Sequence, residues 1–250
     1  MEKSITKRAL SMLLAIALIL CTIPAISLPT FAASESDLTF ELLEYGENQG
    51  GPNGYKITGC DLNASGELVI PSEYNGKPVS LIGSNAFRNC TELTSITVPD
   101  SVFEIMSNAF EGCTGLKTLV INDVPYIGSE AFLGCTSLES VTLPNGIEEI
   151  SYGMFEGCTS LASVTIPDTV KSISGHAFEG CTWLASITIP DSVTAIGWGA
   201  FQGCTGLKQI KISDNVAELD NCVFQNCTSL TSITIPKSVT TIDSDIFSGC

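Results

Sequence analysis

Cysteine is the most reactive side chain that recurs with a fixed spacing in this sequence. Eight cysteines each follow a phenylalanine by three residues, and they are 23 residues apart except for one step of 22. The eight are Cys90, Cys113, Cys135, Cys158, Cys181, Cys204, Cys227 and Cys250. Such a series could form disulfides, bind a metal or supply nucleophiles. Which of these is possible depends on the secondary structure in which the cysteines lie.

The repeat that carries the cysteines predicts a solenoid. One unit reads Leu-x-x-Ile-x-Ile-Pro-Asp-x-Val-x-x-Ile-Gly-x-x-Ala-Phe-x-Gly-Cys. Its alternating start is typical of a half-buried strand, Pro-Asp favours a turn, and Ala-Phe-x-x-Cys suits one helical turn. The Gly or Asn before each cysteine predicts a positive φ that ends this turn.

So short a unit cannot bury its apolar face alone, whereas stacked copies share one continuous core. We therefore expect a mostly β, right-handed stack of about eight coils. It should have a parallel β-sheet with strands about 4.8 Å apart, short second strands, single helical turns and a small β-rich N-terminal cap.

The stacking decides how the cysteines are interpreted. Equivalent Cβ atoms of adjacent coils should lie about 4.8 Å apart, beyond the roughly 3.8 Å that a disulfide prefers. A linear column also cannot place four ligands tetrahedrally around zinc. We predict that the column cysteines are small buried apolar residues. Cys60 and Cys222 lie off the column, and Cys222 either forms an intermolecular bond or is simply tolerated.

The single histidine, His176, limits the possible catalytic mechanisms. It shares a column with Cys222 but lies two coils away, about 10 Å at the strand spacing. A nucleophile and its base need roughly 3 Å, so this pair cannot act as a dyad. His176 is predicted to be a surface residue.

Aspartates recur directly after the strands, and turn stabilisation explains them better than calcium binding does, since no Asp-x-Asp-x-Asp-Gly loop occurs. They are Asp100, Asp168, Asp191 and Asp214. The sequence thus predicts no enzyme activity, no cofactor and no metal site.

Residues 1–33 have the pattern of a secretory signal peptide. Three basic residues precede a long apolar run, which prolines interrupt and small residues end, and this pattern favours a cleaved signal over a membrane anchor. We expect a secreted or cell-surface protein without a membrane span after cleavage. Removing this segment leaves 8 basic and 26 acidic residues, a net charge of −18. Such a surface disfavours nucleic-acid binding.

The run from Cys227 to Ile242, CTSLTSITIPKSVTTI, and its counterparts resemble the BspA-like class of leucine-rich repeat, found in secreted and surface proteins of bacteria and some protists. The resemblance covers residues 67–250, preceded by a cap over residues 34–66. It implies a horseshoe or gently curved solenoid and a role in protein recognition, often adhesion, and it implies no reaction. Because the chain stops within a unit, we expect the solenoid to be truncated or uncapped at its C-terminus.

Side chains that face away from the core are the candidates for partner binding. The strands present two columns rich in Ser and Thr, in which strand propensity and solubility compete with binding as explanations. Exposed aromatics, which often anchor interfaces, are the second set, with scattered tolerated residues as the alternative. The candidates are Ser163, Thr165, Ser186, Thr188, Gln209, Lys211, Tyr152, Trp183 and Trp198.

The sequence therefore favours a non-enzymatic, adhesin-type module whose partner is a protein of a host matrix or neighbouring cell. Two alternatives remain open. One is a spacer or scaffold region of a larger secreted enzyme, and the other is a carbohydrate-binding surface module.

Overall fold

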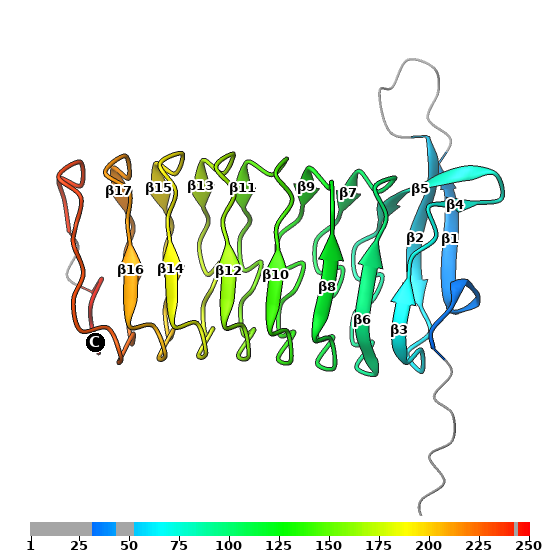
Figure 1. The fold of residues 1–250 in the computed structure, drawn as a ribbon, viewed down its shortest axis with the longest axis horizontal. Helices are drawn as coiled ribbons and strands as arrows, with labels where there is room; N and C mark the ends of the chain where they lie inside the picture. The colour runs from blue at the N-terminus through cyan, green and yellow to red at the C-terminus, as the bar shows by residue number, and fades with distance from the viewer. Residues whose placement is uncertain (1–31, 44–52, 243–244) are drawn as a thin grey trace, which may run out of the picture. The chain divides into compact units, whose positions relative to one another are not determined.

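A computed structural model describes residues 32–43, 53–242 and 245–250, so nearly all of the predicted signal peptide lies outside the described residues. Within them the chain forms a solenoid whose coils as far as Leu219 each contribute a long strand and a second strand, on opposite sides (Figure 1). The described residues after Leu219 contain no strand. The long strands are β3 (Gly66–Val69), β6 (Leu93–Val98), β8 (Thr118–Ile121), β10 (Ser140–Thr142), β12 (Ser163–Thr165), β14 (Ser186–Thr188) and β16 (Gln209–Lys211). The second strands are β5 (Lys77–Ile82), β7 (Glu104–Ile105), β9 (Tyr126–Ile127), β11 (Glu149–Ile150), β13 (Ser172–Ile173), β15 (Ala195–Ile196) and β17 (Glu218–Leu219).

The cap is β-rich, as expected. A 3₁₀ helix, η1 (Glu35–Asp37), leads into β1 (Leu38–Leu43), which pairs antiparallel with β2 (Gly54–Cys60). β2 then pairs in parallel with β5, and β4 (Glu73–Tyr74) lies antiparallel to β5. The cap thus continues directly into the sheet of second strands. None of the helices in the described ranges is long and apolar enough to cross a membrane.

Parallel pairing of equivalent residues confirms the predicted solenoid. The long strands form sheets in the orders β12-β10-β8-β6-β3 and β14-β16, and the second strands form β5-β7-β9 and β11-β13-β15-β17. Ser163 pairs with Ser140, and Thr188 with Lys211, so the strand columns are in register. The second-strand sheet is interrupted between β9 and β11, next to the shortened unit.

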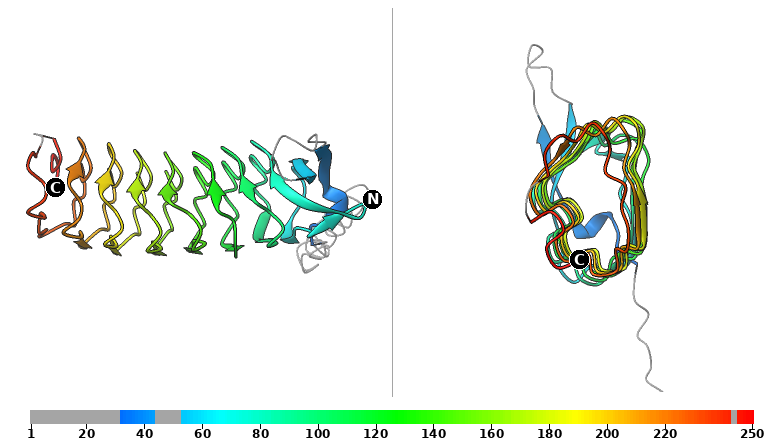
Figure 2. Two further views of the ribbon diagram at one scale, coloured as in Figure 1. Left: turned by 90° about the horizontal axis from the view of Figure 1, so that it is seen from above. Right: turned by 90° about the vertical axis from the view of Figure 1, so that its left-hand side faces the viewer.

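Phenylalanine forms the centre of the core. Seen end on, the coils superpose into one closed outline (Figure 2), which places equivalent side chains above one another. The rings from Phe87 to Phe247 stack on their neighbours with centroids 4.9 to 5.8 Å apart and nearly parallel planes. All of them except Phe247 are fully buried. The repeat therefore buries a continuous aromatic column.

The predicted helical turns are wrong, because the segment between second strand and cysteine is a chain of tight turns. In one coil the hydrogen bonds run from Ala177 to Ser174, from Glu179 to His176 and from Cys181 to Phe178. Two left-handed residues prevent a helix: His176 has φ 56° and Gly180 has φ 69°. The positive φ of Gly180 was predicted from the Gly/Asn preference before the cysteine. The positive φ of His176 was not predicted, because equivalent positions in the other coils hold many residue types.

The predicted Pro-Asp turn is present and is closed by a backbone hydrogen bond. In the coil of Asp191 the amide of Val193 donates to the carbonyl of Pro190 at 3.1 Å, while the aspartate side chain is exposed. In some coils the residue between Asp and Val adds a bond to the preceding coil: Thr169 Oγ1 donates to the carbonyl of Ile147 at 2.7 Å, and Ser101 Oγ donates to that of Val79 at 2.9 Å. In the coil of Asp191, by contrast, Oγ of Ser192 is buried without a hydrogen-bond partner among the described residues.

Candidate binding surfaces and the cysteine column

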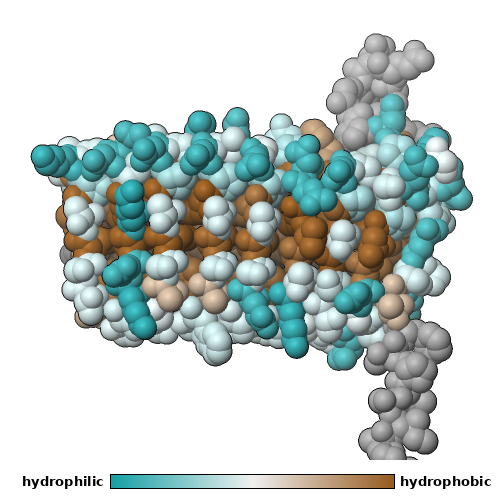
Figure 3. All heavy atoms as spheres, viewed as in Figure 1, coloured by the Kyte–Doolittle hydropathy of each residue, from teal (hydrophilic) through white to brown (hydrophobic). Residues whose placement is uncertain are grey.

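The long-strand face carries six of the nine candidate residues, and all six are exposed. Figure 3 shows an apolar band along the middle of this face, with side chains of near-neutral hydropathy in it and beside it. A hollow of about 530 Å³ lies on β12 and β14 and reaches Lys211 on β16. Ser163, Thr165, Ser186 and Thr188 line it together with Lys211, so the structure brings five of the predicted residues around one depression.

Lys211 gives this hollow its charge pattern. Asp168 and Asp191 line the same hollow, and a neighbouring hollow of about 470 Å³ joins Lys211 to Asp191 and Asp214. A cation is thus set among three turn aspartates on a face that is otherwise hydroxylated. Gln209 begins the same strand but lines neither hollow.

The three aromatic candidates do not form one patch. Tyr152 and Trp198 flank the imidazole of His176 edge to face, with ring centroids 5.2 and 4.4 Å from it. Trp183, which is 69% exposed, lies on the loop that precedes β14. The surface prediction for His176 is corrected: its side chain is only 12% exposed because the two rings cover it.

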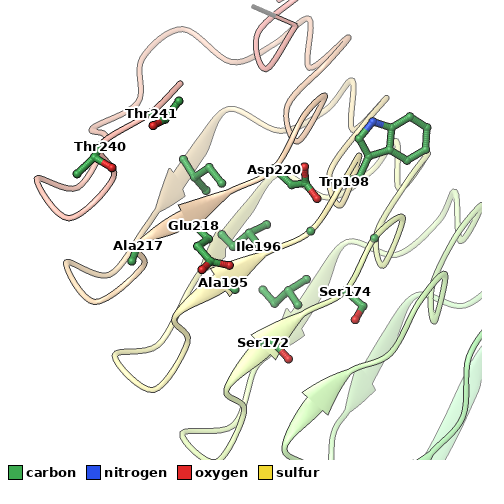
Figure 4. A pocket seen from close by; sticks show the side chains of 14 residues that line it. Ser172, Ser174, Ala195, Ile196, Trp198, Ala217, Glu218, Asp220, Thr240 and Thr241 are labelled. Atoms are coloured by element: carbon green, nitrogen blue, oxygen red, sulfur yellow. The ribbon is translucent and has the colours of Figure 1, made fainter. Parts of the chain in front are cut away.

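A third hollow, of about 700 Å³, lies over the second strands β13, β15 and β17 (Figure 4). Trp198 stands at one end of it, and both apolar side chains and hydroxyl or carboxylate side chains line the rest. Ser172, Glu218 and Asp220 are among these polar residues. Sequence reasoning missed this surface, because the second strands are only two residues long and show no alternation.

The cysteine column is buried as predicted, from Cys90 to Cys227, and only Cys250 at its end is exposed. The thiols have a role that the sequence did not reveal. From Cys113 onward each Sγ–H donates to the carbonyl of the phenylalanine one coil earlier, at 3.0 to 3.2 Å, as Cys158 does to Phe132. The carbonyl of Phe132 also accepts a hydrogen bond from the amide of Cys135, which lies in the same coil as Phe132. The thiol therefore links adjacent coils as well as filling the core.

Cys60, whose state the sequence left open, lies beside the first column cysteine. A hydrogen bond between the two thiols raises the pKa of Cys60 and lowers the pKa of Cys90. Both sulfurs also lie near the carbonyl oxygen of Asp61, at 3.6 and 4.0 Å. Cys60 thus extends the column into the cap. Cys222 is half-buried in the column of His176.

Burial predicts a thiol count that can be measured. Of the ten cysteines in the described residues, seven are buried, and Cys60, Cys222 and Cys250 are not. With a reduced chain that lacks the predicted signal, Ellman's reagent should label no more than three thiols in the native state and ten in guanidinium. Cys222→Ser should lower the native count by one. Rapid native labelling of more than three thiols would contradict the buried column.

Comparisons with known proteins agree with this architecture. Residues 67–183 and 149–250 match the family model described as BspA type leucine rich repeat region, in six copies. The crystal structure of a leucine rich repeat protein of T. pallidum is 30% identical, with a TM-score of 0.70 over 80% of this chain and 90% of that chain. A leucine rich cell surface protein of Faecalibacterium prausnitzii is 27% identical, with a TM-score of 0.41 over 86% of this chain and 85% of that one. No curated protein matches.

The family match spans residues 67–250, which is more than half of the chain and includes every phenylalanine and cysteine of the two columns. The fold, the repeat length and the match agree, and the chain belongs to the BspA-type leucine-rich repeat family.

Proposed function

We propose that this chain is a secreted or cell-surface module that binds a protein ligand through its long-strand face, in the manner of an adhesin and without catalysis. The observation that carries the proposal is the hollow on β12 and β14, which five of the predicted binding residues line. Its walls offer hydroxyl groups that both donate and accept hydrogen bonds, which suits the backbone and amide groups of a protein.

Charge and register give the face its specificity. Most of its coils repeat Ser and Thr, whereas Gln209 and Lys211 replace the pair on β16. A ligand with an acidic group opposite Lys211 and basic groups opposite the turn aspartates would complement this pattern. Complementary charge sets register and association rate more than total affinity.

Binding to a panel of immobilised extracellular-matrix proteins tests the proposal. For a protein that binds, Lys211→Glu is expected to weaken affinity about tenfold, which corresponds to about 1.4 kcal/mol. Thr188→Arg should weaken it as well, because a bulky side chain fills the hollow. Lys208→Glu is the matched control, since Lys208 is exposed in the same coil but lines neither hollow. Equal binding by all three variants would reject the long-strand face.

Carbohydrate binding is a second candidate, and the hollow over β13, β15 and β17 favours it. Trp198 at its end presents an exposed indole, and the polar side chains nearby could bind sugar hydroxyls. On a glycan array, Trp198→Ala should abolish any positive signal while Trp183→Ala leaves it unchanged. An array without signal for the unmodified chain would exclude this candidate.

A further inference from the structure

Three adjacent coils place polar side chains around the only histidine of the chain. In each coil the left-handed residue and the residue three positions later lie at equivalent places. The pairs are Gly153 with Glu156, His176 with Glu179, and Gly199 with Gln202. The histidine therefore lies between two glycines in its own column, which leaves space beside its ring for side chains of the neighbouring coils.

The two glutamates converge on the imidazole. One ligand atom of Glu156, one of His176 and one of Glu179 all lie within 4.8 Å of one another, and Nδ1 of His176 contacts a carboxylate oxygen of Glu179. Gly153 allows this arrangement, because a Cβ there would lie 3.2 Å from Oε2 of Glu156 and 3.0 Å from Cγ of Glu130. The carboxylate of Glu156 occupies that space.

The following coil supplies an unsatisfied acceptor. Oε1 of Gln202 is buried and has no hydrogen-bond partner among the described residues. It lies 3.0 Å from the position that a Cβ on Gly199 would take, and Nδ1 of His176 lies 3.5 Å from the same position. A buried carbonyl oxygen needs a donor or a cation, so this orphaned atom points to a missing partner at the cluster.

The electrostatics of the cluster also call for a cation. The carboxylates of Glu156 and Glu179 lie close together beside one imidazole, and two carboxylates repel each other unless a positive charge lies near both. Among the described residues, the Lys and Arg ion pairs are Lys56 with Glu41 and Arg88 with Glu111, and neither reaches these carboxylates. The rings of Tyr152 and Trp198 cover the histidine and reduce the solvation of the site.

We propose that Glu156, His176 and Glu179 bind a divalent transition-metal cation of the Zn²⁺ class, with Oε1 of Gln202 as a further ligand. One imidazole nitrogen with carboxylate oxygens is a donor set that zinc accepts, at about 2 Å from each ligand. Donor atoms around a tetrahedral ion are then roughly 3.3 Å apart, which small side-chain rotations can reach from the present arrangement. Calcium would want six to eight oxygen ligands and no imidazole. The site is independent of the strand face proposed above for protein binding.

Isothermal titration of tag-free, metal-stripped protein with ZnCl₂ tests the site. We expect one ion per chain with a micromolar dissociation constant, and Co²⁺ should give visible absorption bands from the same site. His176→Gly and Glu179→Gln should each weaken Zn²⁺ binding about tenfold or more. Glycine already occupies this column with the same left-handed backbone in both adjacent coils, so the variant is compatible with the fold.

Asn85→Gly is the matched control. Asn85 lies in the same column at φ 61°, four coils from His176, and its Oδ1 accepts a hydrogen bond from Arg88 at 3.5 Å, so its loss should leave zinc affinity unchanged. Absence of Zn²⁺ and Co²⁺ binding by the unmodified chain would overturn the proposal. Unchanged binding by both His176→Gly and Glu179→Gln would overturn it as well, by showing that the ion binds elsewhere on the acidic surface.

Discussion

Replacing Phe178 by Ala is expected to destabilise the solenoid by about 3 to 5 kcal/mol. Phe178 is fully buried and stacks on Phe155 and Phe201, with ring centroids 5.5 and 5.3 Å apart. Its removal creates a cavity shared by three coils, which a rigidly stacked backbone cannot close. Because each coil is stabilised chiefly by its neighbours, the loss acts on two interfaces at once.

Denaturant unfolding followed by tryptophan fluorescence measures this cost, since Trp183 follows Phe178 by five residues and Trp198 lies in the next coil. Phe247→Ala is the matched control. Phe247 ends the column, is half-buried and stacks only on Phe224, so its removal should cost clearly less. Equal costs for the two variants, or a cost below about 1 kcal/mol for Phe178→Ala, would contradict a shared aromatic core.

Most of the fold could be predicted because the same spacing of apolar residues recurs in eight units. The alternation from Leu184 to Pro190 determines which side of the strand faces inward, and parallel stacking then brings Ser186 opposite Gln209. The phenylalanine and cysteine columns followed from the same spacing. The binding candidates on β12, β14 and β16 were found for the same reason, as positions of opposite phase to the core.

The cluster around His176 could not be predicted from the sequence. It depends on the backbone conformation at a position of the repeat that shows no preference for one residue type. The column of His176 adopts positive φ in every coil from Asn85 to Cys222, yet it holds Asn, Glu, Gly, His and Cys. Only this conformation turns His176 toward Glu179 and beneath the rings of Tyr152 and Trp198. The thiol-to-carbonyl bonds were missed in a similar way, because burial alone explained the cysteines.

Alkaline pH is expected to destabilise the protein steeply because of the buried thiols. Burial raises the pKa of six column cysteines, and it raises the pKa of Cys158 and Cys227 to about 12. The other four are Cys113, Cys135, Cys181 and Cys204. In the unfolded chain each thiol ionises near its ordinary value of 9.0, whereas in the folded chain it stays protonated.

The number of protons bound by the folded and unfolded states determines the direction in which stability changes with pH. Above pH 9 the unfolded state binds fewer protons than the folded state, so the free energy of unfolding falls as pH rises. The contribution is fully present below pH 9 and is lost between there and the raised pKa. Each thiol contributes a slope of about 1.4 kcal/mol per pH unit, so six together approach about 8 kcal/mol per unit.

Urea unfolding at intervals from pH 8 to 11, with a phosphine reductant to prevent oxidation, measures that slope. Cys158→Ser should reduce it by about 1.4 kcal/mol per pH unit, because a serine hydroxyl can still donate to the carbonyl of Phe132 but does not ionise in this range. The other ionisable groups are the same in both proteins, so their contributions cancel in the comparison. Cys222→Ser, outside the column, should leave the slope unchanged. If Cys158→Ser also left it unchanged, the thiols would not be the groups that limit alkaline stability.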